Sequence, residues 1–176
     1  MSSSSSCAMF EKRRALLLAL AAWPLVGLAN ERPAELRRWG SGQFRRFGFL
    51  VYEATLWAGD DPQQAPLALR LDYKRNITGA DIAEASVKEM RRTVADEARL
   101  ADWGRRMARI FPDVKPGDHI VGHYRPEGAL FMQGERELGR IDEPDFARAF
   151  FGIWLDPRTS APELRAALLR PTGSGS

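Results

Sequence analysis

Two adjacent arginines, Arg45 and Arg46, are the residues best suited to bind an anionic group. They adjoin the run FGFLVYEATLW, whose aromatic and β-branched residues are typical of a strand. Because successive side chains of a strand point to opposite faces, alternation sends one arginine to each face. One of the two could then point into an apolar cavity and bind an anion. The alternative is that both are exposed charged residues at the end of a strand.

Glu89 is a second residue with possible chemistry. It lies seven residues after Ile82, so the two share one face of a helix, roughly 100° from the centre of its apolar stripe. A pocket wall could lie on this flank, and a carboxylate there could act as a general base. The alternative is a surface glutamate in a mixed-charge face.

The histidines and the cysteine do not predict a metal site. On a strand, His119 and His123 would lie on one face, about 13 Å apart, which is too far for one metal ion. The single cysteine, Cys7, lies close to the start of the chain. The chain carries no phosphate-binding loop, nucleophile elbow or zinc-protease motif. We therefore expect neither a metal nor a cofactor.

Residues 1–29 are predicted to be a secretory signal peptide. The basic stretch MFEKRR, which begins at Met9, is followed by an apolar run that ends in small residues, and Ala29 would precede cleavage before Asn30. An uncleaved membrane anchor is the alternative. The apolar run is shorter than the ~20 residues of a spanning helix, and Pro24 interrupts it. We expect a periplasmic or secreted protein without a membrane span after cleavage.

The distribution of charge argues against nucleic acid as a partner. The whole chain has a net charge of +3, and removal of residues 1–29 leaves 23 basic and 22 acidic residues. Arginines alternate with acidic residues and do not form the basic stripe of a nucleic-acid reader. Mixed-charge, solvated faces are the better interpretation.

Residues 30–170 are predicted to form one α+β domain, followed by a disordered tail over 171–176. Strands are expected over 36–57 (two strands or one bent strand), 67–73, 119–124, 129–133 and 137–141. Helices are expected from residue 78, over 98–110, over 143–155 and over 161–170. This order predicts an antiparallel sheet with helices packed on one face.

The predicted helices carry sequence signals for their starts. Thr78 with Asp81 resembles a capping box, and an apolar stripe follows at Ala83, Val87, Met90 and Val94. Asp142 is expected to cap the helix over 143–155, and Ser160 with Glu163 the last helix.

Several stretches of the chain, taken in order, resemble the bacterial exported branch of the chalcone isomerase-like family. These stretches are GSGQFRRFGFLVYEATLW, LRLDYKRNITGADI, FPDVKPGDHI, the meander to GERELGRID, and DFARAFFGIWLDPRTSAPELRAALL. They cover most of residues 36–170. The resemblance implies an open-faced β-sandwich, in which a large antiparallel sheet is covered on one face by helices. This fold agrees with the α+β prediction.

The resemblance does not imply the plant activity. Plant members cyclise a chalcone by attack of a phenolate oxygen on an enone, held by an Arg, a Thr, a Tyr, an Asn and a Ser or Thr. The Arg matches Arg45 or Arg46, whereas the Thr falls on Phe47 and the Tyr and Asn fall on Ile82 and Glu89. A carboxylate in place of the Asn would repel a phenolate, so chalcone cyclisation is not expected.

The last hydroxyl of the plant site corresponds to Thr159 or Ser160. Either could contribute to a ligand site, although a helix cap explains Ser160 equally well.

Three functions remain open. In the first, the protein binds a fatty acid or another lipophile, as some members of the family do, with Arg45 or Arg46 on the carboxylate and Tyr52 or Tyr73 nearby. In the second, the protein is an isomerase or lyase for another small molecule, with Glu89 as the base. In the third, Glu89 pairs with one of the arginines and closes the cleft, which leaves a structural or partner-binding module. The first and third are favoured over an enzyme.

Overall fold

The computed structural model describes residues 35–170, so the predicted signal peptide and the predicted tail lie outside the described residues. The strands are β1 (Arg37–Arg46), β2 (Phe49–Ala58), β3 (Leu67–Tyr73), β4 (His119–Arg125), β5 (Gly128–Gln133) and β6 (Arg136–Ile141). The helices are α1 (Gly79–Met90), α2 (Glu97–Ile110), α3 (Pro144–Leu155) and α4 (Pro162–Leu168).

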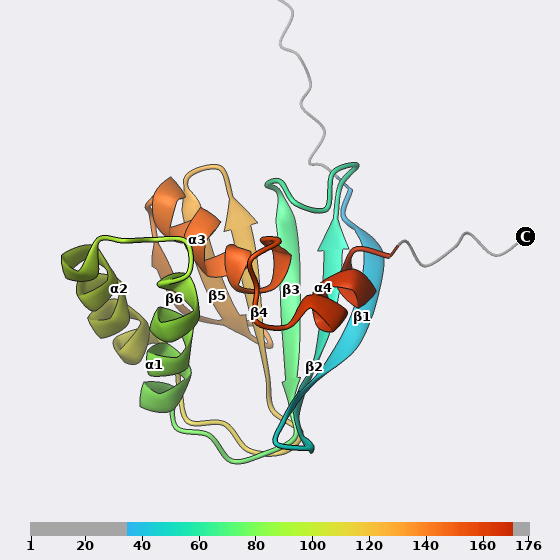
Figure 1. The fold of residues 1–176 in the computed structure, drawn as a ribbon, viewed down its shortest axis with the longest axis horizontal. Helices are drawn as coiled ribbons and strands as arrows, with labels where there is room; N and C mark the ends of the chain where they lie inside the picture. Colours follow the sequence, from blue (N-terminus) through green and yellow to red (C-terminus); the bar gives the residue numbers. More distant parts are fainter. Residues whose placement is uncertain (1–34, 171–176) are drawn as a thin grey trace, which may run out of the picture. The chain divides into compact units, whose positions relative to one another are not determined.

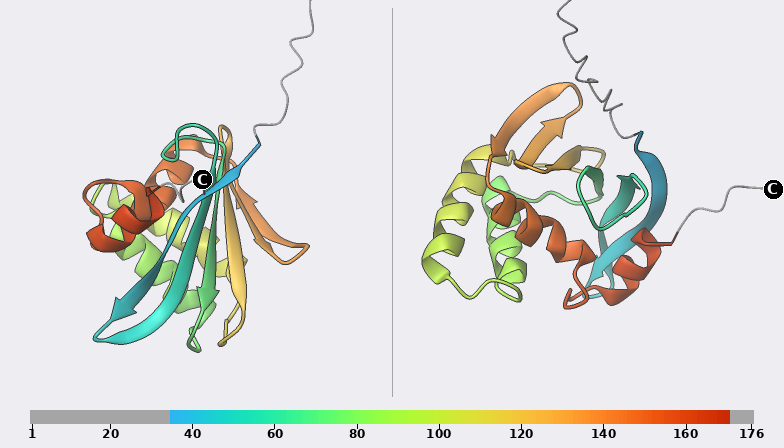
Figure 2. Two further views of the ribbon diagram at one scale, coloured as in Figure 1. Left: turned by 90° about the vertical axis from the view of Figure 1, so that its right-hand side faces the viewer. Right: turned by 90° about the horizontal axis from the view of Figure 1, so that it is seen from above.

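The strands form one antiparallel sheet in which each strand pairs with its neighbour in sequence, from β1 to β6. Helices α1 and α2 are inserted between β3 and β4, and α3 and α4 follow β6 (Figure 1). The helices lie on one face of the curved sheet (Figure 2). The predicted α+β class and the helix-covered antiparallel sheet are confirmed.

Alternation along the strands decides which side chains face the helices. In β3, Leu67, Leu69 and Tyr73 are buried, whereas Arg70 and Asp72 on the other face form an ion pair with each other. This is the half-buried strand that the alternating sequence predicted. The inner face of the sheet is therefore apolar, and the helices must cover it.

Helix α3 is the central helix of this cover, and its aromatic rings pack on the middle of the sheet. The ring of Phe150 lies 5.0 Å from that of Phe131 on β5, and the ring of Phe151 stacks on Tyr124 of β4 at the same distance. Gly122 on β4 makes room, because a Cβ there would meet the Phe151 ring at 3.2 Å. Such aromatic contacts stabilise the core beyond the area they bury.

The predicted start of α1 is confirmed, but the predicted apolar stripe extends past the end of the helix. The Thr78 hydroxyl accepts a hydrogen bond from the backbone N–H of Asp81 at 3.1 Å. The helix ends at Met90, because the backbone N–H of Thr93 and of Val94 both bond to the Met90 carbonyl and turn the chain. Val94 therefore lies beyond the helix, although it still packs against the core.

The predicted cap of α3 by Asp142 is wrong. The N-cap residue is Glu143, and its side chain makes no cap hydrogen bond. Its carboxylate instead accepts from the indole N–H of Trp103 at 2.9 Å and pairs with Arg106. These contacts, led by the Trp103 hydrogen bond, lower the pKa of Glu143 and join α2 to the start of α3.

The predicted capping of the last helix by Ser160 is also wrong. Helix α4 has Ala161 as its N-cap and no side-chain cap. The neighbouring Thr159 hydroxyl accepts from the backbone N–H of Ala161 at 3.1 Å and donates to the carbonyl of Ile153 at 2.6 Å. Thr159 thus fixes the turn from α3 to α4, and Ser160 does not cap the helix.

Substitution of Gly40 tests how tightly α4 packs on β1. A Cβ at Gly40 would lie 2.2 Å from the carbonyl oxygen of Ala167. We expect Gly40→Ala to lower the free energy of unfolding by about 1–3 kcal/mol, measured by urea denaturation. Gly59→Ala is the control, since no atom lies within 4 Å of a Cβ there and its stability should barely change. Equal losses in the two variants would contradict this account of the α4 contact.

Candidate functional site

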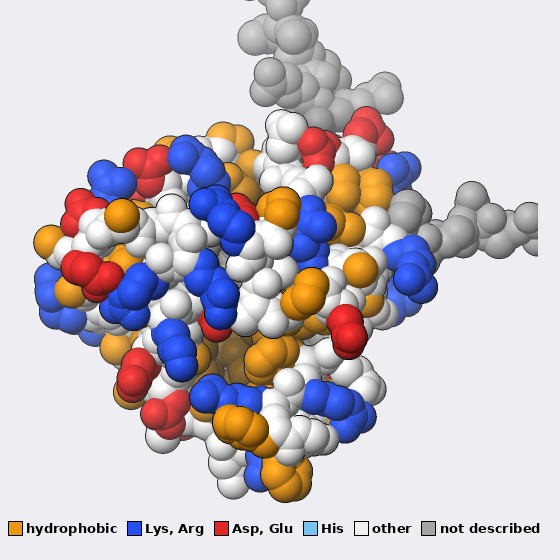
Figure 3. All heavy atoms as spheres, viewed as in Figure 1, with side chains coloured by type: hydrophobic (Ala, Val, Ile, Leu, Met, Phe, Trp, Pro, Cys, Tyr) orange, Lys and Arg blue, Asp and Glu red, His pale blue; other side chains and the backbone are white. Residues whose placement is uncertain are grey.

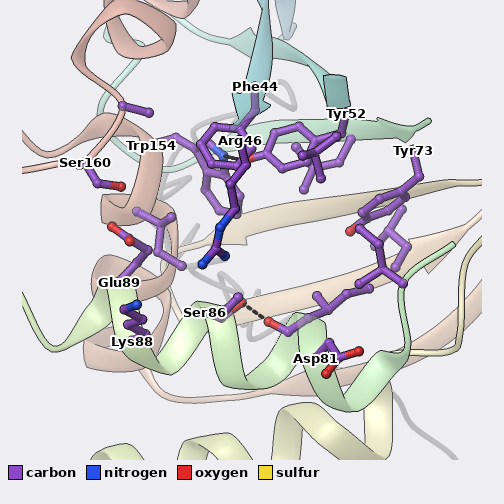
Figure 4. Close-up of a pocket in the computed structure, with 18 of the residues that line it drawn as sticks. Phe44, Arg46, Tyr52, Tyr73, Asp81, Ser86, Lys88, Glu89, Trp154 and Ser160 are labelled. Carbon is purple, nitrogen blue, oxygen red and sulfur yellow. Dashed lines mark hydrogen bonds between the residues drawn. The ribbon is translucent and has the colours of Figure 1, made fainter. Parts of the chain in front are cut away.

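A cavity of about 580 Å³ lies between the first three strands of the sheet and the helices α1 and α3. Figure 4 shows side chains from β1, β2 and β3 facing side chains from α1 and α3 across it. The segment between α3 and α4 completes the wall through Ser160 and Ala161. The volume falls within the ~300–1,000 Å³ of typical small-molecule sites.

Most of the cavity wall is apolar. In Figure 3 the cavity opens as a hollow with a hydrophobic floor and with basic side chains around its mouth. The apolar and aromatic residues of the wall are Phe44, Phe47, Val51, Tyr52, Leu71, Tyr73, Ile77, Ile82, Ala85, Phe111, Ile120, Phe150, Ile153, Trp154 and Ala161. A wall of this composition favours a lipophilic occupant.

Tyr52 joins the sheet to the central helix at the cavity. Its hydroxyl accepts a hydrogen bond from the indole N–H of Trp154 at 3.0 Å, and its ring stacks on Phe44 at 4.9 Å. Burial raises the pKa of Tyr52 well above its usual value. The phenol is therefore neutral, and its acceptor lone pair is used to hold Trp154 in place.

Tyr73 presents a hydroxyl that has no hydrogen-bond partner among residues 35–170. The residue is only 3% exposed and lines the cavity, and no hydrogen bond to its hydroxyl is present among the described residues. No buried polar side-chain atom of the described part lacks a partner, so this hydroxyl must reach open space. Figure 4 shows it directed toward the cavity. Burial raises its pKa, so it is a neutral donor available to a ligand.

The two arginines predicted from the sequence have different surroundings. Arg45 donates to the side chain of Gln43 at 3.0 Å and to the carbonyl of Gly48 at 3.3 Å. Arg46 points from β1 across the cavity toward α1 (Figure 4). Both line the cavity, but of the two arginines it is Arg46 that is directed into it.

A β-bulge contributes to this part of the wall. Phe44 pairs with Tyr52, whereas Arg45 pairs with Leu50, so the pairing passes over Val51. Bulges of this kind redirect side chains near sites. Val51 consequently lines the cavity beside Tyr52.

Glu89 lines the cavity but does not pair with either predicted arginine. Its carboxylate accepts from Nε of Arg92 at 3.0 Å, and its side chain is 23% exposed. The closed cleft expected from a Glu89 pair with Arg45 or Arg46 is therefore not found. Arg92 compensates the glutamate from three residues further along the chain, and the cavity stays open.

Basic groups outnumber acidic groups around the cavity. The wall contains four basic residues, Arg45, Arg46, Lys88 and Arg92, against the two acids Asp81 and Glu89. Among the ion pairs of residues 35–170, none involves Arg46 or Lys88. The site therefore has uncompensated positive charge beside an apolar interior, which favours an anion with a lipophilic body.

The structure brings most of the predicted site residues together. Arg45, Arg46, Tyr52, Tyr73, Ile82 and Glu89 all line the cavity. Thr159 does not, because its hydroxyl is engaged in the turn before α4, and Ser160 lies in the wall instead.

Three charged residues of the wall were not predicted as site residues: Asp81, which was predicted only as part of a helix cap, Lys88 and Arg92. For Lys88 and Arg92 a sequence signal was present. Lys88 lies seven residues after Asp81, the same spacing that placed Glu89 beside Ile82. Arg92 lies three residues after Glu89, a distance at which side chains on a helix meet.

Comparison with known proteins identifies the family. The model of the family described as chalcone isomerase-like matches residues 33–170, and the chain belongs to this family. An uncharacterized protein of Haemophilus influenzae is 28% identical over 138 residues, which are 77% of this chain and 68% of that protein.

A solved structure agrees in fold. The crystal structure of a fatty-acid binding protein from Arabidopsis thaliana has a TM-score of 0.57 to this structure at 12% identity, and the match covers 78% of this chain and 90% of that one. Within residues 35–170, no helix has the length and apolar character needed to cross a membrane.

The two cavity tyrosines form a matched pair for mutation. Tyr52→Phe leaves the buried indole N–H of Trp154 without an acceptor, so the free energy of unfolding should fall by about 1–3 kcal/mol. Tyr73→Phe removes a hydroxyl that bonds to none of the described residues, so it should be nearly neutral in the same denaturation experiment. A loss at Tyr73 as large as that at Tyr52 would show that the Tyr73 hydroxyl is held by the protein.

Proposed function

We propose that this chain binds a small lipophilic anion, such as a fatty acid, in the cavity and is not an enzyme. The observation that carries the proposal is Arg46, a cation with no acidic partner in the described chain, which is directed into an apolar cavity. A bound carboxylate would supply the missing negative charge, and the hydrocarbon would lie on the apolar wall.

Other groups support the same orientation of the ligand. Lys88 adds a second cation at the cavity that forms no ion pair within residues 35–170. The Tyr73 hydroxyl offers a donor for which the described residues supply no competing partner. The fold neighbour from Arabidopsis thaliana is by its name a fatty-acid binding protein, which makes this ligand class the first to test.

The enzyme alternative has less support. Glu89 would have to serve as the base, yet its carboxylate is compensated by Arg92 at 3.0 Å and lies at a partly exposed position. Ile82, which stands where the plant enzymes have a tyrosine, offers no hydroxyl to polarise a ketone. The geometry therefore favours binding over proton abstraction.

A fatty-acid titration tests the ligand site. We expect the purified chain to bind cis-parinaric acid, a fluorescent fatty acid, and to release extractable lipophile to mass spectrometry after purification. Arg46→Gln should weaken binding about tenfold or more, because charge-assisted hydrogen bonds contribute about 1.5–3 kcal/mol. Arg45→Gln should weaken it less, since this guanidinium is already bonded to Gln43 and Gly48.

Glu89→Gln separates binding from catalysis. Loss of this negative charge should leave fatty-acid affinity equal or higher, since it removes repulsion of the carboxylate. Weaker binding in this variant, or no binding of any fatty acid by the unmodified chain, would contradict the proposal.

We also propose that residues 1–29 direct export, to the periplasm or the medium, and are then removed. The support is the order of a basic stretch, an apolar run and small residues in the sequence. In a bacterial host, mass spectrometry of the purified protein should find Asn30 as the first residue. A protein that keeps the leader and sediments with membranes would instead indicate the uncleaved anchor.

A further inference from the structure

The turn between β1 and β2 has an unusual sequence for its conformation. The last strand pair is Arg46 with Phe49, which leaves Phe47 and Gly48 as a two-residue turn. Their φ angles are 51° and 81°, both in the left-handed region. Turns of this type favour Asn-Gly, and a bulky aromatic residue with positive φ is a strained choice. Local stability alone does not explain a phenylalanine at this position.

Phe47 in this turn and Phe49 at the start of β2 are both exposed. Phe47 is 87% exposed and Phe49 is 62% exposed, and no other large apolar side chain of residues 35–170 is exposed. In Figure 3, hydrophobic side chains project below the hollow, where Figure 1 places the β1–β2 turn. Two aromatic rings thus protrude together at one end of the sheet.

Three arginines surround these rings. The guanidinium carbon of Arg46 lies 5.4 Å from the centre of the Phe47 ring, and that of Arg75 lies 5.0 Å from the centre of the Phe49 ring. Arg45 donates to the carbonyl of Gly48 in the same turn. Within the described part of the chain, none of the three arginines has an acidic partner. We call Arg45, Arg46, Phe47, Phe49 and Arg75 the hairpin tip.

We infer that the hairpin tip docks on an anionic phospholipid surface. Exposed phenylalanines can enter the boundary between headgroups and acyl chains, while unpaired arginines remain at the level of the anionic headgroups. A protein partner is the less suitable occupant, because two rings on a narrow turn offer far less area than a stable protein interface. Positive charge that forms no ion pair within residues 35–170 complements a negative bilayer in particular.

The position of the tip connects docking with the cavity. Arg46 and Phe47 belong to the tip and also line the cavity, so the cavity wall extends to the docking surface. A lipophile could then pass between bilayer and cavity without crossing bulk water. This transfer step rests on the proposed function, whereas docking itself does not.

Vesicle flotation tests docking in the absence of added fatty acid. The purified chain should float with vesicles made of equal parts phosphatidylcholine and phosphatidylglycerol, and not with pure phosphatidylcholine, and salt should weaken the association. Arg75→Gln should weaken binding about fivefold, whereas Arg136→Gln, which removes an exposed charge at the start of β6, should leave it unchanged.

Two tip variants separate docking from folding and from ligand binding. Phe47→Asn should weaken flotation about tenfold or more yet melt at a higher temperature, because Asn tolerates the left-handed conformation. Phe49→Thr should weaken flotation while cis-parinaric acid binding in solution stays unchanged, because Phe49 is not part of the cavity wall.

Several outcomes would overturn docking. One is flotation that these variants do not reduce, another is equal binding to neutral vesicles, and a third is a self-association lost in Phe47→Asn without any vesicle binding. The third result would make the tip a protein interface. Vesicle binding without fatty-acid binding would instead reject the proposed function and leave docking standing.

Discussion

Helix α3 is held against the middle of the sheet by its aromatic rings, and the placement of the other helices depends on this contact. Phe150 and Phe151 pack on β4 and β5, where Gly122 provides the space they need. Helix α1 packs on α2 and α3, and α4 packs on β1. Helix α3 thus fills the inner face over β4 and β5 and α4 packs closely on β1, while the inner face of β1 to β3 keeps a cavity between the sheet and α1.

Around this cavity the two carboxylates are bonded to neighbouring side chains, whereas two of the cations form no ion pair within residues 35–170. Arg92 compensates Glu89, while Asp81 accepts from the Thr78 hydroxyl at the start of α1. Arg46 and Lys88 have no such partners in the part of the chain that the structure describes. A cavity that keeps unpaired cations beside aromatic walls is suited to hold a charged head and an apolar body in one orientation.

The sequence predicted those features of the structure that depend only on residues close together in the chain. The Thr78 cap was predictable because it needs only neighbouring residues, and the alternation that buries Tyr73 needs only the period of a strand. The choice of Arg46 over Arg45 as the residue directed into the cavity required the three-dimensional arrangement of β1 against α1. The bond from Trp154 to Tyr52 links residues 102 positions apart, so no local pattern could reveal it. Both wrong cap predictions expected a side-chain cap where there is none: the Glu143 carboxylate before α3 bonds to α2, and the Thr159 hydroxyl before α4 fixes a turn.

The arginines of the hairpin tip, which have no acidic partner within residues 35–170, place positive charge at one end of the sheet. Without residues 1–29 the chain would carry 23 basic and 22 acidic residues, so a distant charged surface would exert almost no net pull on it. A field acts on a dipole even when the net charge is close to zero, and it does so by rotation. The positive charge of the hairpin tip therefore favours orientations in which the β1–β2 turn faces a negatively charged surface, before the first atoms touch.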